Sequence, residues 1–201
     1  MSQISVAPIV EGQGDEAAAR LLLQRVWIEL VGGTHANVLK PIRRSRGLLL
    51  RQDSGDLEKA INLALLKLER YGDGLVLILI DAEEDCQKLG SLGPLLLDRA
   101  QRARGDKDIA VVVANIMYET WFVAAAASLT EYLDLPEDDP LPPDPEAERL
   151  GKGWIKQRTK WGKYSETADQ AAFTARMDLA LCRAHSPSFD KLCRELEKRR
   201  S

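Results

Sequence analysis

Acidic residues follow two apolar stretches of this chain where strands of a sheet would end, and this pattern constrains the fold more than any other. The apolar stretches span residues 4–10 and 75–80. If both are strands of one parallel sheet, their carboxyl ends lie at the same edge, where open α/β sheets place their sites. Carboxylates gathered there repel one another unless a cation lies between them, and Mg²⁺ prefers such oxygen ligands. The sequence therefore predicts a metal site suited to phosphate chemistry.

The candidate ligands come from three strand ends. Glu11 and Asp15 are four residues apart, so a strand end and the first helical turn can direct both at one point. The alternative is that Asp15 is only a helix N-cap and Glu11 a solvated turn residue. Glu119 follows the apolar stretch 109–116 and is either a further ligand or an acid in the first turn of a helix.

A second group of acids follows residues 75–80. Asp81, Glu83 and Asp85 alternate along the chain, and alternate residues of an extended segment point to the same side. We therefore expect all three to face the metal site, although acids at this point can also cap a helix or line a loop. Phosphoryl transfer with two metal ions needs several carboxylates around ions about 4 Å apart.

Apolar and amphipathic stretches alternate along the first two thirds of the chain. Residues 75–80 are uniformly apolar, as in a strand buried on both faces, and residues 109–116 repeat this pattern. A short strand is expected over 38–42, where Pro41 favours a sheet edge or a bulge. The helices expected from apolar spacing cover residues 17–30, 57–70, 92–104 and 119–133. This order predicts an α/β fold with a mainly parallel, Rossmann-like sheet of about four strands flanked by helices.

The last third of the chain has a different composition. Prolines and acids crowd residues 134–151, which predicts a loop rather than a core element. The chain is basic and helical after that, with expected helices over 167–184 and 187–200. We therefore divide the sequence into an α/β domain (1–133), an acidic Pro-rich loop (134–151) and a basic helical C-terminal extension packed on the same domain (152–201).

The overall charge argues against a protein coated in basic residues, because the 201-residue chain carries a formal net charge of -3. Local basic stripes, such as residues 37–51, suit an anionic partner bound at one site. The three cysteines lack metal-type spacing, and we find neither a secretory signal nor an apolar run of membrane-spanning length. We therefore expect a cytoplasmic protein.

Basic and aromatic side chains are interleaved between residues 152 and 164. Such a segment can bind phosphates through its cations and stack bases on its rings. A lysine within it can also neutralise charge in a phosphoryl-transfer transition state. The alternative is a loop folded on the core with its lysines in solvent. The candidates for nucleic-acid binding here are Lys152, Lys156, Arg158 and Trp161, and the candidate catalytic lysines are Lys160 and Lys163.

A second candidate phosphate contact consists of Arg43, Arg44 and Arg46. Basic residues at a sheet edge are also common without any ligand, which is the alternative for these three. Other site classes are disfavoured. No Lys-Ser/Thr pair follows Gly12-Gln13-Gly14, so the P-loop is absent, and two histidines offer neither a Ser/His/Asp set nor zinc-ligand spacing.

The two acidic motifs resemble those of the Toprim fold, the catalytic module of topoisomerases, primases and OLD-family nucleases. The segment Ile9-Val10-Glu11-Gly12-Gln13-Gly14-Asp15 is similar to the first motif, with Asp15 at the position of the second acid that OLD-type members carry. The segment Leu79-Ile80-Asp81-Ala82-Glu83 is similar to the second motif, but Glu83 stands where Asp is typical. The longer reach of Glu changes the expected metal geometry.

The chain looks closest to small stand-alone bacterial Toprim-like proteins, which are often encoded beside ATPases in defence-type gene clusters. Glu119-Thr120-Trp121 and the stretch from Lys163-Tyr164 to Phe189 agree with that family. The resemblance implies cleavage of nucleic acid, in the first place DNA, that depends on Mg²⁺ or Mn²⁺. It also implies an antiviral-defence or DNA-processing role, an ATPase partner and a protein that can form oligomers.

Three hypotheses follow. The first is a metal-dependent endonuclease, in which Glu11, Asp81 and Glu83 hold the metal with help from Asp15, Asp85 and Glu119. The second is a noncatalytic Toprim-like partner of an ATPase that binds nucleic acid or protein and cuts nothing. The third is a phosphotransfer domain with Asp81 as nucleophile, which the lack of Ser/Thr and Lys after the later strands disfavours.

Overall fold

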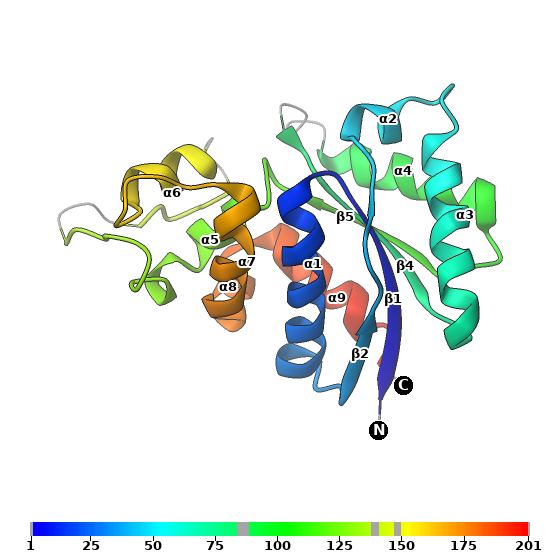
Figure 1. The fold of residues 1–201 in the computed structure, drawn as a ribbon, viewed down its shortest axis with the longest axis horizontal. Helices are drawn as coiled ribbons and strands as arrows, with labels where there is room; N and C mark the ends of the chain where they lie inside the picture. Colours follow the sequence, from blue (N-terminus) through cyan, green and yellow to red (C-terminus); the bar gives the residue numbers. More distant parts are fainter. Residues whose placement is uncertain (1, 84–88, 138–140, 147–149, 201) are drawn as a thin grey trace.

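Five parallel strands form the centre of the computed structural model, which describes residues 2–83, 89–137, 141–146 and 150–200 (Figure 1). The strand order is β2-β1-β4-β5, and β3 pairs with β1 beyond the end of β2. The strands are β1 (Gln3–Val10), β2 (His35–Val38), β3 (Ile42–Arg43), β4 (Leu75–Asp81) and β5 (Ile109–Ala114). The predicted α/β class with a mainly parallel sheet is confirmed.

Successive side chains of a strand point to opposite faces of a sheet, and here both faces are apolar. Helices therefore cover both faces. In β4, Leu75, Leu77 and Leu79 enter one apolar core, and the residues between them enter the other. The first core is covered by α1 (Gln13–Arg25) and α9 (Pro187–Glu197), and the second by α2 (Arg46–Leu50), α3 (Asp56–Leu68) and α4 (Leu89–Arg104). In Figure 1, α1 and α3 lie on opposite sides of the sheet.

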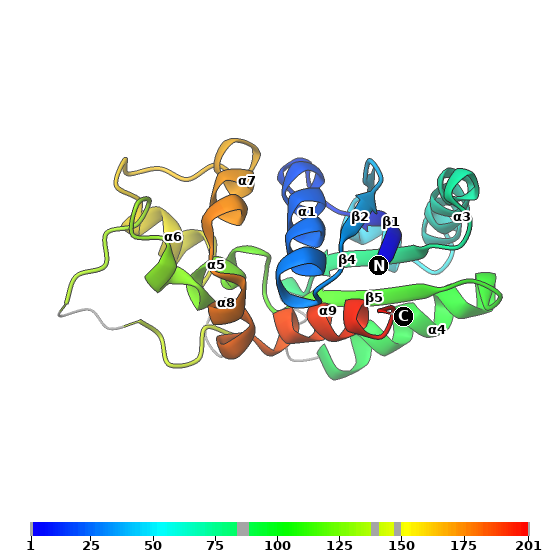
Figure 2. The same cartoon turned by 90° about the horizontal axis from the view of Figure 1, so that it is seen from below.

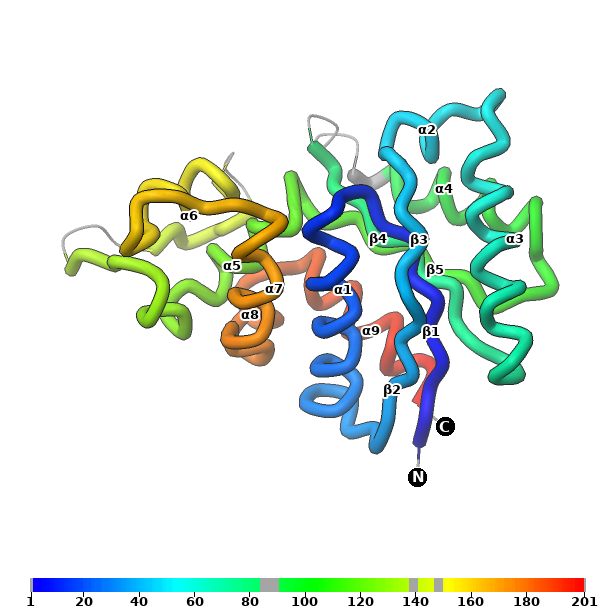
Figure 3. The backbone as a smooth tube through the Cα atoms, in the orientation of Figure 1, coloured from blue at the N-terminus to red at the C-terminus, as the bar shows by residue number. Residues whose placement is uncertain are grey.

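The C-terminal helices share the first core with the sheet. The remaining helices are α5 (Glu119–Ala124), α6 (Lys152–Arg158), α7 (Glu166–Arg176) and α8 (Leu179–His185). Helix α7 packs against α1, and α9 packs along β5, as Figure 2 shows. The ring of Phe173 in α7 contacts Phe122 of α5, with ring centroids 5.3 Å apart. Figure 3 shows that α5 to α8 extend the molecule to one side of the sheet.

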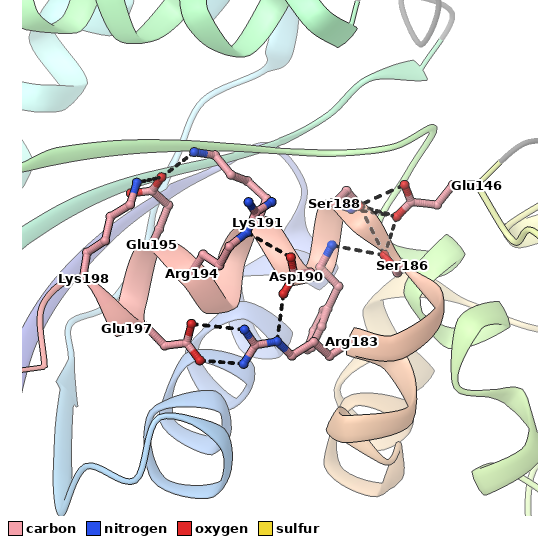
Figure 4. Close-up of polar contacts among 11 residues, drawn as sticks. Glu146, Arg183, Ser186, Ser188, Asp190, Lys191, Arg194, Glu195, Glu197 and Lys198 are labelled. Carbon is pink, nitrogen blue, oxygen red and sulfur yellow. Dashed lines mark hydrogen bonds and ion pairs between the residues drawn. The ribbon is translucent and has the colours of Figure 1, made fainter.

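Polar contacts fix α8 and α9 to each other and to the acidic loop (Figure 4). Arg183 of α8 donates hydrogen bonds to Asp190 and Glu197 of α9. At the start of α9, the Ser188 hydroxyl donates to Glu146 Oε1 at 2.6 Å. The break at Ser186-Pro187 lies where the sequence predicts it, because Ser186 caps α9 and Pro187 occupies its first turn.

Three expected elements differ from the structure. The strand expected over 38–42 is two strands, because Pro41 has no N–H to donate and the pairing with β1 stops there. The helix expected over 119–133 ends at Ala124 and is followed by a 3₁₀ turn (Ala126–Ser128). In this turn the Ser128 hydroxyl donates a hydrogen bond to the Ala125 carbonyl at 2.6 Å. The helix expected over 167–184 is divided, because Asp178 caps a new helix at Leu181 N–H.

Two short helices, α2 and α6, were not expected from the sequence. A π-helical turn (Val26–Leu30) extends α1, and a 3₁₀ turn (Glu69–Tyr71) extends α3. The acidic loop contains neither helix nor strand in its described residues. None of the helices in the described ranges has the length and apolarity needed to cross a bilayer.

Candidate functional site

Four carboxylates approach one another at the carboxyl edge of the sheet, and we call Glu11, Asp15, Asp81 and Glu119 the acidic centre. Glu11 follows β1, and Asp81 ends β4. Asp15 lies in the first turn of α1, and Glu119 begins α5 after β5. All the strand pairings are parallel, so these ends meet at one edge, as the sequence predicts.

Backbone N–H groups from neighbouring strand ends hold Glu11 and Asp81. Glu11 Oε1 accepts a hydrogen bond from the backbone N–H of Asp81 at 2.5 Å. Asp81 Oδ1 accepts one from the backbone N–H of Tyr118 at 2.9 Å. The ends of β1, β4 and β5 are thereby linked through their acidic side chains rather than through strand pairing alone.

Asp15 lies inside the helix rather than at its N-cap, which corrects the alternative considered from the sequence. Gly12 is the N-cap, and its N–H donates to Asp15 Oδ2 at 2.8 Å. The other oxygen, Oδ1, accepts from Gln170 Nε2 of α7 at 2.9 Å. Gln170 is 1% exposed. Asp15 therefore connects α1 to the C-terminal extension.

Glu119 is the most deeply buried acid of the centre, with 1% of its surface exposed. Its Oε1 accepts a hydrogen bond from the Tyr164 hydroxyl at 2.9 Å. Its Oε2 is also buried and has no hydrogen-bond partner among the described residues. A buried carboxylate oxygen without a donor is costly, so this atom is available to a cation or a donor that enters the site.

Burial and nearby negative charges shift Glu11 and Asp81 toward their protonated forms. Burial raises the pKa of Glu11 to about 7; the Glu83 and Asp15 carboxylates add to this rise, and the Asp81 N–H opposes it. Burial raises the pKa of Asp81 well above its ordinary value, and the nearby Asp15 and Glu11 charges raise it further. A cation bound at this edge would relieve the repulsion that the Asp15 and Glu11 charges exert on Asp81.

Lys152, at the start of α6, is a lysine whose positive charge acts on the acidic centre. Burial raises the pKa of Glu119 to about 7, and Lys152 is the main opposing influence. Lys152 also lowers the pKa of Asp81. Its ammonium group forms an ion pair with Glu166 of α7. An open cavity of about 420 Å³ is lined by Lys152 and Tyr164, together with Lys156 and Glu166.

Glu83 does not extend β4 toward the centre as the alternation predicts, which is a correction. The strand ends at Asp81, and Glu83 has a φ of +49°, so the chain turns away from the extended conformation. Its carboxylate is exposed and lies 3.6 Å from the Arg46 guanidinium. Asp85 lies outside the described residues.

Arg46 fixes this turn. Its Nε and Nη2 donate hydrogen bonds to the backbone carbonyls of Asp81 and Ala82, both at 3.0 Å. It therefore positions the end of β4, a role that its sequence context did not suggest. Arg43 is exposed, and the Arg44 guanidinium donates to the Arg43 carbonyl at 2.8 Å.

The basic candidates of the C-terminal extension lie in a different setting. Lys156, Lys160 and Lys163 are exposed. The Arg158 guanidinium lies over the Trp154 ring, 4.3 Å from its centroid, and Trp161 is 41% exposed. The structure records no contact of Lys160 or Lys163 with the acidic centre, in contrast to Lys152.

The donor set of the acidic centre consists entirely of oxygens, which suits Mg²⁺ or Mn²⁺. Within the described ranges, however, no three His, Cys, Asp or Glu side chains are arranged to share one ion. Mg²⁺ is commonly held by one or two carboxylates together with a substrate phosphate, and the centre fits that mode. The unpartnered Glu119 Oε2 is the specific observation that supports this fit.

Sequence reasoning missed the supporting residues Tyr164, Glu166 and Gln170, and it assigned Lys152 to nucleic-acid binding alone. Gln170 and Asp15 are separated by 155 positions, so no local spacing could connect them. The only available signal was the placement of polar residues, such as Gln170 and Thr174, on the apolar face of a predicted helix. Both of these residues are buried.

A family model described as "Domain of unknown function (DUF4276)" matches residues 10–197, which is nearly the whole chain and includes all of the acidic centre. No curated protein and no solved structure matches the sequence.

Proposed function

We propose that this chain, which belongs to the DUF4276 family, binds Mg²⁺ or Mn²⁺ at its acidic centre and cleaves phosphodiester bonds of nucleic acid. The observation that carries the proposal is the link between the ends of β1 and β4, where Glu11 accepts a hydrogen bond from the Asp81 backbone N–H and its charge helps to raise the pKa of Asp81. Acids arranged to repel each other at a sheet edge are stabilised when a cation binds between them. The resemblance to Toprim-fold nucleases supports the same chemistry.

Glu11, Asp81 and Glu119 would hold the cation, with Asp15 as a further neighbour. When bound, the cation would supply Lewis-acid activation and neutralise charge on the phosphate. Glu11, whose pKa in the metal-free protein is raised to about 7, would have to lose its proton before it could hold the cation. Tyr164 keeps Glu119 in place through its hydroxyl group, and Gln170 does the same for Asp15.

Lys152 is the cation we propose for stabilising the charge that develops on the phosphate. The sequence suggested Lys160 or Lys163 for this role, but Lys152 lies close enough to lower the pKa of both Asp81 and Glu119. Its ion pair with Glu166 keeps it beside the centre until a phosphate competes for it. We place this reaction in the cytoplasm, as the sequence predicts, and in a defence or DNA-processing system, as the resemblance implies.

A noncatalytic partner of an ATPase is the second candidate function. The observation that favours it is the absence, within the described ranges, of three acids arranged around one ion, together with the outward position of Glu83. Such a module would keep the fold and bind nucleic acid or protein without cutting it.

Cleavage assays separate the two candidates. Supercoiled plasmid, single-stranded DNA and RNA are incubated with the protein in Mg²⁺, Mn²⁺ or EDTA. We expect metal-dependent cutting by the wild type and none by Asp81→Asn, which retains an oxygen for the Tyr118 N–H. Asp53→Asn, an exposed acid in the connection between α2 and α3, is the matched control and should cut normally. Cutting by Asp81→Asn at the wild-type rate would refute the nuclease proposal.

Folding of each variant is checked by circular dichroism and thermal unfolding. If the folded wild type cuts no substrate in either metal, the noncatalytic function is favoured. In that case the protein should still bind nucleic acid in EDTA, or it should co-purify with an ATPase encoded beside it.

A further inference from the structure

We propose that Trp161 stacks on an unpaired base, so that the nucleic acid bound by this chain is single-stranded where it crosses the C-terminal extension. This inference rests on the proposed nucleic-acid ligand, but it does not depend on cleavage. It defines the substrate class more narrowly than the acidic centre alone can.

Trp161 differs from the other tryptophans in its exposure. Trp27, Trp121 and Trp154 are all buried, whereas 41% of Trp161 is exposed. Arg158 covers the Trp154 ring, which leaves Trp161 as the accessible indole of the basic segment. An exposed indole gains free energy when a flat apolar surface covers it, and a nucleobase offers such a surface.

The Trp161 ring is held in place rather than free to rotate in solvent. It packs edge-to-face on Tyr132, with centroids 5.7 Å apart and planes at 83°. The turn that carries it is closed by a hydrogen bond from Gly162 N–H to the Thr159 carbonyl at 2.9 Å, and Gly162 has a φ of +68°. A second bond, from Lys160 N–H to the Tyr132 carbonyl at 3.0 Å, ties the turn to the chain before the acidic loop. A fixed ring loses little conformational entropy on binding.

The charge of the segment that carries Trp161 favours nucleic acid over a protein partner. Lys156, Lys160 and Lys163 are exposed and form no ion pair with any described residue. The sequence from residue 150 to residue 165 contains no Asp or Glu. Cations interleaved with an exposed ring can follow a phosphate backbone while the ring stacks on a base.

The same segment is anchored to the acidic centre at its Tyr164 end, and its Lys152 end lies close to Glu119. Lys152 begins it and influences the pKa of Glu119, and Tyr164 ends it with a hydrogen bond to Glu119. The cavity lined by Lys152, Lys156 and Tyr164 adjoins that anchor. A strand bound along the segment is therefore led to the carboxylates.

The base that meets Trp161 must be unpaired, because bases within a duplex are already stacked on their neighbours. Taking one out of a duplex costs a few kcal/mol, whereas a single strand presents its bases directly. The contact therefore selects single strands, tails, gaps or bubbles over intact duplex.

Binding is measured in EDTA, so that no strand is cut, with a fluorescein-labelled oligothymidylate and a duplex of equal length. We expect the wild type to bind the single strand more tightly, and Trp161→Ala to bind it at least about five-fold more weakly. Trp161→Phe retains a ring and should recover part of the loss. Tyr71→Ala is the matched control. It removes a 52% exposed ring from the 3₁₀ turn that follows α3.

Acrylamide quenching of tryptophan fluorescence tests the contact in the wild type itself. Since the other three indoles are buried, the quenchable emission should come mainly from Trp161 and should disappear in Trp161→Phe. Oligothymidylate should protect that emission from acrylamide, and this readout does not require a variant that might lose stability.

Each outcome decides the inference. Weaker binding by Trp161→Ala together with protection from acrylamide supports it, whether or not the protein cuts nucleic acid. Unchanged affinity in a folded Trp161→Ala, no protection on binding, or no binding to the wild type overturns it. Equal loss of single-strand and duplex binding would also overturn it, and binding of an acidic peptide alone would identify a protein-docking surface instead.

Discussion

Glu11 accepts a hydrogen bond from the backbone N–H of Asp81, a residue 70 positions away in the sequence. This bond joins the ends of two neighbouring strands and brings two carboxylates together where water is partly excluded. The pairing of β1 with β4 fixes the separation, because Ile9 lies opposite Ile78 and both strands continue in the same direction. The repulsion between the two acids is therefore built into the register of the sheet.

Glu119→Gln should make the metal-free protein more stable at neutral and alkaline pH. The folded-state pKa of Glu119 is raised to about 7, above its ordinary value of 4.5, so the folded protein binds the extra proton between these values. The stability of the wild type therefore falls as pH rises through this window, by about 3 kcal/mol for such a shift. The variant should lack this fall. Urea unfolding at several pH values in EDTA measures it, and equal pH profiles would contradict the prediction.

Mn²⁺ should stabilise the wild type more at about pH 8 than at about pH 6. Glu11 and Glu119, whose pKa values are both about 7, must lose their protons before they can bind a cation. A ligand that binds only the folded state raises the unfolding temperature, so the shift reports occupancy. Thermal unfolding with Mn²⁺ and with EDTA gives both values, and Glu11→Gln should show a smaller shift. A shift that is independent of pH would rule out these groups as ligands.

The positions of the central strands could be predicted because β4 and β5 are buried on both faces of the sheet. Only an uninterrupted apolar run, such as residues 75–80, fits a strand buried in this way. Their parallel order then placed Glu11, Asp81 and Glu119 at one edge. The alternation predicted for Glu83 was wrong, because it applies only while the chain remains extended and the chain turns at this residue. The charge of Glu83 still raises the pKa of Glu11. Lys152 and Gln170 could not be placed, because their partners lie far away in the sequence.

Gly14→Ala should destabilise the protein by about 1–3 kcal/mol and reduce cleavage. A Cβ at this position would lie 2.6 Å from the Glu166 carbonyl oxygen and would also meet Gln170. The backbone of α7 would have to move away from α1, which weakens the Gln170 contact to Asp15. Gly47→Ala in α2 is the control, since nothing lies within 4 Å of its Cβ, and it should be neutral. Urea unfolding measures the stability of both variants. If Gly14→Ala is as stable as Gly47→Ala, α7 does not approach α1 closely at Gly14.

Glu195→Gln should destabilise the protein near neutral pH and have little effect in strong acid. Burial acts to raise the pKa of Glu195, but hydrogen bonds from Lys191 and Lys198 (Figure 4) and from Arg199 more than offset it and lower the pKa to about 2. The stability from this lowered pKa is present above pH 4.5 and is lost as pH falls toward 2. We expect a cost of about 1–2 kcal/mol, because the two lysines lie partly in solvent. A loss that persists unchanged at low pH would indicate a packing effect.

Glu146→Ala should detach the end of the acidic loop from α9 and lower stability by about 1–2 kcal/mol. Glu146 Oε1 accepts hydrogen bonds from the hydroxyl groups of Ser186 and Ser188, and Ser188 also accepts one from the Trp121 indole at 2.8 Å. Removing the carboxylate leaves both hydroxyl groups and the Ser188 backbone N–H without this acceptor, although Ser186 still caps the helix. Glu137→Ala, an exposed acid of the same loop, is the control and should have no effect. Thermal unfolding compares the two variants, and limited proteolysis reports whether the loop is released. If Glu146→Ala is as stable and as resistant as Glu137→Ala, this contact does not hold the loop, and its position must depend on the Leu133–Thr159 bridge at its other end.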